Sequence, residues 1–348
     1  MKTILITGAA GFIGSHLTDE MLRRGHRVIA FDNLSQGNLR NLEDARRHPA
    51  FSFVHGDVRD PETLRGAAAQ RLDMILHLAA FKIPRYGKAS DTLLVNSQGT
   101  LNVLRLAAER SSRFLITSTS DVYGKNPRIP FAEDDDSVLG SPTVARWAYA
   151  TSKLFDEHLA LTLSEELGFS SVLIRVFGSY GPRQHLSWWG GPQSVFIDAI
   201  LHDQVIPLHG DGLQTRSFCY ISDTVRGIAD AAEAEDINRE VINIGNDREI
   251  TILELAAEIH RLCATKRPLR TQTIAYDDIA GRKYEDVRRR VPDLSKAKRL
   301  IGYQPRVALD EGLRRTIEWQ RGITAFADAE KLAAVDETAQ PALQEARG

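Results

Sequence analysis

The sequence predicts an α/β fold in which helices connect the strands of a parallel sheet. Short runs rich in β-branched and aromatic residues alternate with longer segments of helical periodicity. A parallel connection needs a crossover, and the intervening segments are long enough to supply one. At 348 residues, the chain has room for about two domains, or for one large α/β unit with an appendage.

Strands and helices are expected to alternate through the first half of the chain. The strands are expected at Thr3–Thr7, Val28–Phe31, Phe51–His55, Met74–Leu78, Phe114–Thr117 and Val172–Phe177. The helices are expected at Phe12–Arg24, Pro61–Gln70, Thr92–Glu109 and Ala148–Glu166.

The pattern changes beyond Gly178. Val205–Phe218 is typical of a hairpin or a loop, and helical periodicity returns at Ile221–Glu233 and Ile252–Leu262. Residues 322–348 have little sustained periodicity, so we expect a loose helix or a disordered tail there.

The composition is that of a globular protein without a strong electrostatic field. The 44 Lys and Arg residues against 46 Asp and Glu give a net charge of −2, which argues against a general nucleic-acid binder. Cys219 and Cys263 form neither a disulfide framework nor a metal-ligand pattern, so we expect packed, reduced thiols and no metal site. No stretch approaches the ~18 apolar residues of a membrane span, and we expect a cytoplasmic protein without a membrane partner.

Three glycines mark the turn between the first strand and the first helix. Gly8, Gly11 and Gly14 stand in the segment TGAAGFIG. Without a Cβ atom they allow a tight turn, close approach of a pyrophosphate and close packing of helix on strand. The free N–H groups and the dipole at a helix N-terminus favour the negative phosphates. Such a segment can also be a simple turn, but the strand before it and the helix after it favour a dinucleotide site.

Two acidic residues strengthen this interpretation. Asp32 ends the second predicted strand, 18 residues after Gly14. Its carboxylate can accept hydrogen bonds from both hydroxyls of the adenine ribose and would repel a 2′-phosphate, which favours NAD over NADP. Asp57 and Val58 follow the third predicted strand, where the carboxylate can meet the adenine amino group. Either acid alone could be a solvated loop residue, but together with the glycines they predict an NAD site.

A tyrosine and a lysine are the candidate acid–base pair. Tyr149 and Lys153 are four residues apart on an expected helix and therefore share a face. An unperturbed tyrosine, with a pKa of about 10, is a poor base at neutral pH. A nearby ammonium group favours the phenolate, so we expect Lys153 to lower the pKa of Tyr149. The spacing alone is common, but the segment TSTSDVYG (117–124) places hydroxyl groups at the end of a predicted strand, where ligands bind in parallel sheets.

Five segments, in their order, resemble the extended short-chain dehydrogenase/reductase family. They are TGAAGFIG, HLAA (77–80), TSTSDVYG, YATSK (149–153) and RVFGSYGPRQ (175–184), and the similarity extends from about residue 3 to residue 320. Within that family the chain resembles the NAD-dependent nucleotide-sugar epimerases and dehydratases, such as UDP-glucose 4-epimerase. The resemblance implies a Rossmann-type doubly wound parallel sheet that holds NAD. It also implies a smaller C-terminal α/β domain that binds a nucleotide sugar, with a UDP-sugar expected.

The resemblance also suggests a division of the chain and a homodimer. Residues 1–178, with a returning segment at about 219–245, would form the NAD domain. Residues 179–218 and 246–321 would form the substrate domain. The dimer would use the helices expected at Thr92–Glu109 and Ala148–Glu166, whose apolar positions exceed what one core face requires.

Individual roles follow from the same resemblance. The expected catalytic residues are Thr119, Tyr149, Lys153 and Asp121. The expected cofactor-binding residues are Gly8, Gly11, Phe12, Ile13, Gly14, Asp32, Asn33, Asp57, Val58, Leu78, Ala79, Ala80, Tyr149 and Lys153. The expected substrate-binding residues are Lys82, Ser120, Asp121, Gly178, Arg216 and Arg290. Arginine suits this role because its planar guanidinium can bind phosphate oxygens in pairs. Asn96 matches a family residue near the active site, although a structural role would equally explain it.

Two positions depart from the family pattern. Gly178 replaces an asparagine that contacts the substrate diphosphate in relatives, so another group must make that contact. Trp188 and Trp189 stand beside two glycines in HLSWWGGPQ (185–193), where they could stack on a base or sugar, or anchor a loop.

Three interpretations of the activity stay open. The favoured one is a 4-epimerase of a UDP-hexose or UDP-hexuronate acting through a transient 4-keto sugar, because the segment DNLSQGN (32–38) resembles epimerases. The alternative is a 4,6-dehydratase or a UDP-glucuronate decarboxylase using Asp121, because relatives of those classes carry an acid two residues after the catalytic Thr119. The third is an NAD-binding sensor or scaffold, which would not need the pair Tyr149 and Lys153.

Overall fold

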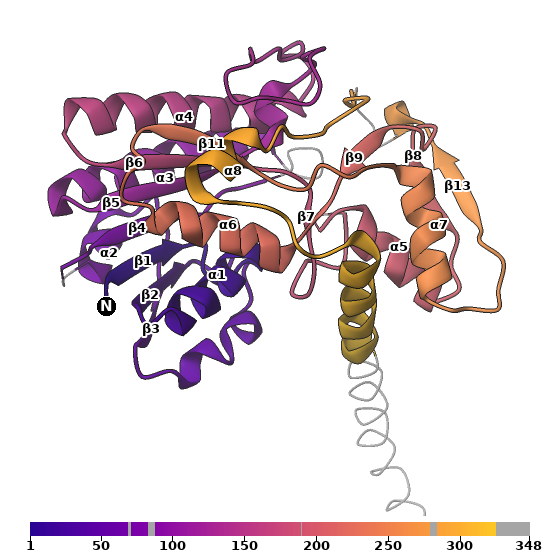
Figure 1. The fold of residues 1–348 in the computed structure, drawn as a ribbon, viewed down its shortest axis with the longest axis horizontal. Helices are drawn as coiled ribbons and strands as arrows, with labels where there is room; N and C mark the ends of the chain where they lie inside the picture. The colour runs from indigo at the N-terminus through magenta and orange to yellow at the C-terminus, as the bar shows by residue number, and fades with distance from the viewer. Residues whose placement is uncertain (69–70, 83–87, 189, 279–283, 325–348) are drawn as a thin grey trace, which may run out of the picture.

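The computed structural model describes residues 1–68, 71–82, 88–188, 190–278 and 284–324 (Figure 1). Its central strands are β1 (Thr3–Thr7), β2 (Arg27–Asp32), β3 (Phe51–His55), β4 (Met74–His77), β5 (Arg113–Thr119), β6 (Ser171–Val176) and β11 (Glu240–Ile244). They form one seven-stranded sheet in the order β11-β6-β5-β4-β1-β2-β3, and every neighbouring pair is parallel. The predicted α/β fold with a doubly wound parallel sheet is therefore confirmed.

Helices cover both faces of this sheet (Figure 1). One face carries α1 (Phe12–Arg23), α6 (Ile221–Glu233) and α8 (Ser295–Ile301), and the other carries α2 (Pro61–Ala67), α3 (Ala89–Arg110) and α4 (Trp147–Glu166). Successive residues of a strand point to opposite faces, so Ile4 and Ile6 join the first core while Leu5 joins the second. Burial on both faces explains why these strands are almost continuously apolar.

Most predicted boundaries lie within two residues of the observed ones, which is the usual uncertainty at element ends. Two helices differ more. The helix expected at Thr92–Glu109 begins three residues earlier, at Ala89. The helix expected at Pro61–Gln70 ends at Ala67, and Gln70 lies outside the described residues.

The region beyond β6 contains short strand pairs and two further helices. Its elements are β7 (Ser179–Tyr180), α5 (Pro192–Leu201), β8 (Ile206–His209), β9 (Thr215–Ser217), β10 (Cys219–Tyr220), β12 (Glu249–Thr251), α7 (Ile252–Leu262) and β13 (Thr271–Ile274). The hairpin interpretation of Val205–Phe218 is wrong, because β8 pairs in parallel with β13 and β9 pairs antiparallel with β12. Local pattern revealed the strands but could not reveal partners more than 30 residues away along the chain.

The last described segment is a helix over residues 309–324. It includes the first three residues of the expected loose tail at 322–348, and the remainder of that tail lies outside the described residues.

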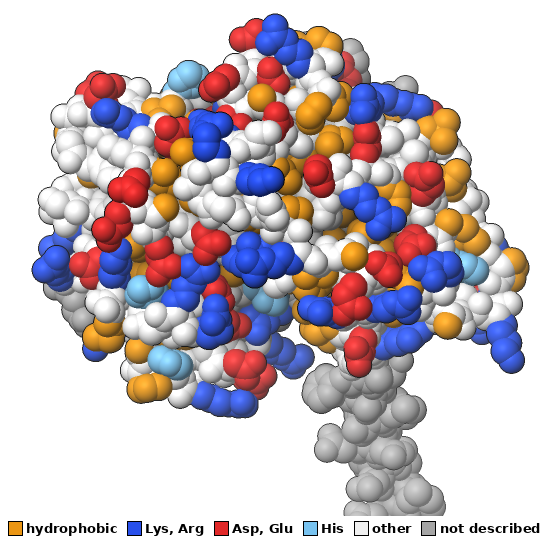
Figure 2. Space-filling view, viewed as in Figure 1, with side chains coloured by type: hydrophobic (Ala, Val, Ile, Leu, Met, Phe, Trp, Pro, Cys, Tyr) orange, Lys and Arg blue, Asp and Glu red, His pale blue; other side chains and the backbone are white. Residues whose placement is uncertain are grey.

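The described surface agrees with the nearly balanced charge of the chain. Acidic and basic side chains are interspersed over the face drawn in Figure 2, without a field of one sign. Cys219 and Cys263 are buried free thiols. Within the described ranges, no helix combines the length and apolarity that crossing a bilayer requires. The same ranges contain no group of three His, Cys, Asp or Glu side chains suited to a metal ion.

Candidate active site

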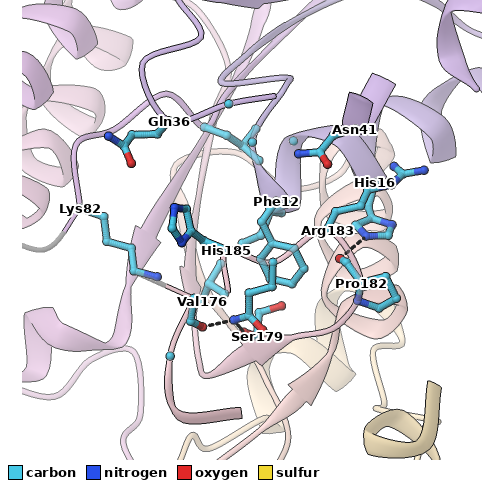
Figure 3. A pocket seen from close by; sticks show the side chains of 18 of the residues that line it. Phe12, His16, Gln36, Asn41, Lys82, Val176, Ser179, Pro182, Arg183 and His185 are labelled. Carbon is cyan, nitrogen blue, oxygen red and sulfur yellow. Dashed lines mark hydrogen bonds between the residues drawn. The ribbon is translucent and has the colours of Figure 1, made fainter. Parts of the chain in front are cut away.

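A groove of about 1920 Å³ follows the carboxyl edge of the sheet, where the turn after β1 and the segments after β4, β5 and β6 meet. In Figure 3, Phe12 lies at the centre of the view. Lys82 and His185 approach from one side, with Pro182 and Arg183 on the other. The predicted site residues that line this groove are Gly8, Gly11, Phe12, Ile13, Gly14, Leu78, Ala80, Lys82, Thr119, Ser120, Asp121, Tyr149, Gly178 and Arg290. These members of the predicted cofactor and substrate sets thus line one cavity.

The glycine turn packs α1 directly against the end of β1. A Cβ atom on Gly14 would lie 2.1 Å from the carbonyl oxygen of Gly8, and one on Gly8 would lie 2.7 Å from the backbone nitrogen of Ala79. Gly11 caps α1 without a side-chain hydrogen bond. The first N–H groups of α1 are therefore presented at the groove without a capping side chain, which fits the phosphates of a dinucleotide.

Asp32 lies beside this turn at the end of β2. It is nearly buried, and its carboxylate accepts hydrogen bonds from the backbone of Ala10 (2.9 Å) and Leu34 (2.7 Å). Burial raises the pKa of Asp32, while these two hydrogen bonds oppose the rise. The acid thereby ties the glycine turn to the loop after β2.

Asp57 is held mainly by its own loop. It accepts hydrogen bonds from Asn33 Nδ2 at 2.9 Å and from Arg59 NH2 at 2.7 Å. Its hydrogen bonds with Arg59 hold the pKa of Asp57 well below its usual range, although burial opposes them. Val58 is buried, and a Cβ atom on Gly99 of α3 would lie 2.6 Å from its side chain.

A neutral histidine connects the glycine turn to α3. His77, at the end of β4, hydrogen-bonds through Nδ1 to Thr7 Oγ1 at 2.7 Å and through Nε2 to Thr100 Oγ1 at 3.1 Å. Burial, assisted by the positive charge of Lys153, lowers the pKa of His77 to about 3. The imidazole is therefore uncharged at neutral pH and serves as a hydrogen-bonding link.

Tyr149 and Lys153 lie near the start of α4, as predicted, but the electrostatics differ from the expectation. Burial raises the pKa of Tyr149, the carboxylates of Asp121 and Asp156 raise it further, and a hydrogen bond with Thr119 opposes them. The Lys153 ammonium donates to Asp156 Oδ2 at 3.0 Å. The expected lowering of the pKa of Tyr149 is therefore wrong for this structure, because burial and two carboxylates dominate.

A cluster of charged side chains, which we call the arginine cluster, lines an inner pocket of about 240 Å³ that adjoins the groove. It consists of Asp121, Arg146, Arg216, Asp286 and Arg290. Arg146 NH1 donates to Asp286 at 2.7 Å, and Arg216 NH2 donates to the same oxygen at 2.8 Å. Asp121 is paired with Arg290 at 2.7 Å and with Arg146 at 3.3 Å.

The cluster contains three arginines and two aspartates, so it has one surplus positive charge. Burial lowers the pKa of Arg290 to about 10; the neighbouring arginines add to this effect and Asp121 opposes it. Burial alone would raise the pKa of Asp286, yet Arg216, Arg146 and Arg290 hold it below the usual range. An additional anion in the pocket would relieve the repulsion between the guanidinium groups.

Comparison with known proteins identifies the family. Residues 5–316 match the family described as GDP-mannose 4,6 dehydratase. The chain belongs to that family. It is 35% identical to the UDP-N-acetyl-alpha-D-glucosaminuronate decarboxylase of Bacillus cytotoxicus, covering 92% of this chain and 98% of the relative. It is 36% identical to the UDP-glucuronic acid decarboxylase 1 of Danio rerio, covering 91% and 72%.

Solved structures with this fold include two epimerases. The UDP-glucose 4-epimerase of Thermotoga maritima has a TM-score of 0.82 at 28% identity, covering 92% of this chain and 99% of the other. The UDP-glucuronic acid 4-epimerase of Bacillus cereus, solved with UDP-glucuronic acid and NAD, has a TM-score of 0.80 at 28% identity, with the same coverage. Members of this family are thus similar to the chain over nearly its whole described length.

The two departures from the family pattern have structural explanations. Gly178 has a φ of +39°, and a Cβ atom there would lie 2.1 Å from the carbonyl oxygen of Ser217, so no side chain fits. Trp188 stacks on His209, with ring centroids 3.9 Å apart, and packs edge-on against Phe196. It anchors its loop and also lines the inner pocket, so both roles considered for it are compatible with its position. Trp189 lies outside the described residues.

Several residues predicted for the site do not line the groove. The side chain of Asn96 accepts a hydrogen bond from the backbone of Phe81 (2.7 Å) and donates to Ser152 Oγ (2.9 Å), which joins α3 to α4. The other predicted residues that do not line the groove are Asp32, Asn33, Asp57, Val58, Ala79, Lys153 and Arg216, the last of which lines the inner pocket.

Sequence reasoning missed Arg146 and Asp286. Arg146 precedes α4 by one residue, and Asp286 lies 140 positions later in a segment without helical or strand periodicity. The position of Arg146, three residues before Tyr149, was the available signal for the arginine; nothing local marked the aspartate.

We predict that Arg146→Gln lowers the free energy of unfolding by about 1–3 kcal/mol, because Asp121 and Asp286 each lose one of their two guanidinium partners and keep the other. Urea unfolding followed by circular dichroism measures the change. The control is Arg289→Gln, which removes an exposed pair with Glu249 and should change the free energy of unfolding much less. Equal losses in the two variants would contradict a structural role for the arginine cluster.

Proposed function

We propose that this chain is an NAD-dependent decarboxylase of a UDP-hexuronate. The observation that carries the proposal is the position of Asp121, a carboxylate on the groove paired with Arg146 and Arg290 and electrostatically coupled to Tyr149. The surplus positive charge of the arginine cluster suits a substrate with a carboxylate in addition to its diphosphate. Relatives at 35–36% identity that are named decarboxylases of UDP-uronates support the same choice.

NAD is the cofactor that the groove fits. The glycine turn offers uncapped N–H groups to a diphosphate, and an acid at the end of the second strand, here Asp32, favours NAD over a cofactor with a 2′-phosphate. The Bacillus cereus neighbour was solved with NAD bound. When bound, NAD accepts a hydride from the sugar and returns it at the end of the cycle.

The residues of this chain move the protons. Tyr149 accepts the proton of the C4 hydroxyl as that carbon is oxidised, and the hydroxyl of Thr119 orients the phenol through their hydrogen bond. The resulting 4-ketone is β to the C6 carboxylate. When the C5–C6 bond breaks, carbon dioxide leaves and the electron pair forms an enolate over C5, C4 and O4. C5 then takes up a proton from solvent, and Tyr149 returns its own proton to O4 as the ketone is reduced.

Asp121 favours the decarboxylation step through its charge. A substrate carboxylate bound beside it experiences repulsion, which ends when that group leaves as neutral carbon dioxide. Arg146 and Arg290 are paired with Asp121 and can also hold the substrate carboxylate, since each guanidinium offers five donors.

The second candidate is the 4-epimerase that the sequence favoured. The structural neighbours named as UDP-sugar 4-epimerases support it. It would use Thr119, Tyr149 and Lys153 in the same oxidation, but the keto sugar would turn over with its substituent at C5 intact. The product from a uronate therefore distinguishes the two candidates.

We predict that the purified protein converts UDP-glucuronate to a UDP-pentose with release of carbon dioxide. Mass spectrometry and proton NMR of the product measure this. An isomer of unchanged mass with an inverted C4 proton would establish the epimerase instead. Tyr149→Phe is the matched control: an enzyme loses turnover while it retains NAD, whereas a sensor would keep its function.

We predict that Asp121→Asn reduces decarboxylation by about 10²-fold or more while oxidation at C4 is not slowed. The charge of Asp121 raises the pKa of Tyr149, so its removal favours the base form used in the oxidation, whereas the later loss of carbon dioxide loses the repulsion that promotes it. Rapid-mixing absorbance at the NADH band separates oxidation from carbon dioxide release. Equal slowing of both steps would show that Asp121 acts earlier than we propose.

We also propose that a second copy of the chain covers the outer faces of α3 and α4. Leu94 is 61% exposed on α3, and Phe155 is 52% exposed on α4, which packs beside it. Exposed large apolar side chains on adjacent helices are typical of a subunit interface.

Phe155→Glu is predicted to convert the dimer to a monomer in sedimentation velocity, because a charge would be buried between copies. Leu213→Glu is the control, since Leu213 is similarly exposed but lies in the loop before β9. A wild-type monomer, or a dimer lost only in the control variant, would contradict the proposed interface.

A further inference from the structure

Asp156 forms a buried ion pair with the lysine of the acid–base pair. The carboxylate is 0% exposed, Lys153 is 2% exposed, and the two are 3.0 Å apart on the same helix. Taking two charges out of water is costly, and an ion pair repays the cost only where its geometry is good. Lys153 stands one helical turn beyond Tyr149 and Asp156 about two turns beyond it, and the charge of Asp156 still contributes to the electrostatic environment of the phenol.

The other charged groups near this pair are already engaged. Glu157, the next residue of α4, is bound by Arg175 of β6 at 2.7 Å. His77 of β4 is neutral and bonded to two threonines. Asp121, on the segment after β5, is paired within the arginine cluster. Asp156 is therefore the acid that pairs with Lys153.

We propose that Asp156 is a positioning residue that sets the acid–base strength of Tyr149. It fixes the Lys153 ammonium in the helix turn next to the phenol, and its own negative charge opposes the phenolate. The inference rests on the proposed function only for the role of Tyr149 in proton transfer, which the epimerase candidate shares.

The electrostatics of the site agree with this direction. Beyond the effect of burial, Asp121 and Asp156 both raise the pKa of Tyr149. Burial raises the pKa of Asp156 itself, while Lys153 opposes the rise. A raised pKa keeps the phenol protonated at neutral pH, ready to return a proton to O4. The base form is then the scarcer one, so the rate should rise with pH up to the pKa of Tyr149.

The test is Asp156→Asn, which keeps the shape of the side chain and removes its charge. The pKa of Tyr149 should fall by about one unit or more. The acidic limb of the pH profile of kcat/KM should move to lower pH by the same amount, with KM for the UDP-sugar unchanged because the buried side chain does not contact substrate. NMR titration of 13Cζ-labelled tyrosine, assigned with Tyr149→Phe, measures the pKa without turnover.

Two further variants complete the experiment. Asp156→Glu keeps the charge and should restore the wild-type profile. Ser164→Ala removes a buried hydroxyl near the C-terminal end of the same helix, where it bonds to Ser171, and should leave the pKa of Tyr149 unchanged. If the asparagine variant is unfolded by circular dichroism, Asp156→Ala gives the same measurement.

The outcomes are distinct. An unchanged pKa of Tyr149 in Asp156→Asn would reduce Asp156 to a structural role and overturn the proposal. A rise would also overturn it, because the proposal gives the charge of Asp156 an effect of the opposite sign on the pKa of Tyr149. Failure of the proposed function appears elsewhere, in the identity of the product from UDP-glucuronate, and leaves the NMR titration unaffected.

Discussion

Pairing of buried charges on α4 is the constraint on which the rest of the site depends. This helix and the residue before it contribute four charged side chains to the interior. Lys153 pairs with Asp156, Glu157 with Arg175 of β6, and Arg146 with Asp121 and Asp286. The first pair lies within α4, the second joins α4 to β6, and the third joins the start of α4 to the segments that carry Asp121 and Asp286. An unpaired charge in these positions would cost several kcal/mol, so the pairs fix the orientation of the helix that carries Tyr149.

The same pairings connect the two ends of the cavity. The dinucleotide end is built from backbone, through the close approach of Gly14 to Gly8 and the capping of the turn by Asp32. The other end, at the inner pocket, is lined by the charged side chains of the arginine cluster. Tyr149 lies between them and lines both cavities. Asp121 is paired with Arg290 and raises the pKa of Tyr149. A charged group of a bound sugar that altered this ion pair would therefore also alter the pKa of Tyr149.

Local signals in the sequence predicted most of the sheet and the dinucleotide end. The glycines after the strand Thr3–Thr7 contact one another only a few positions apart in the chain, so the sequence pattern alone is enough to predict this turn. The hairpin at Val205–Phe218 was wrong because β8 and β9 each pair with a strand far along the chain. The predicted direction of the shift in the pKa of Tyr149 was wrong for a related reason. The spacing of Tyr149 and Lys153 revealed the ammonium, but not how deeply the pair is buried or that Asp156 and Asp121 also face it.

The choice between decarboxylation and epimerisation comes down to charge rather than to the oxidation chemistry, which both share. The Bacillus cereus neighbour named as a UDP-glucuronic acid 4-epimerase was solved with UDP-glucuronic acid, so binding of a uronate does not by itself select decarboxylation. Our proposal relies instead on the position of Asp121, which is paired with Arg146 and Arg290 and electrostatically coupled to Tyr149. A substrate carboxylate held by these arginines would lie next to the carboxylate of Asp121, and its loss as carbon dioxide would end the repulsion between the two groups. The proposed decarboxylase therefore depends on the charge of Asp121.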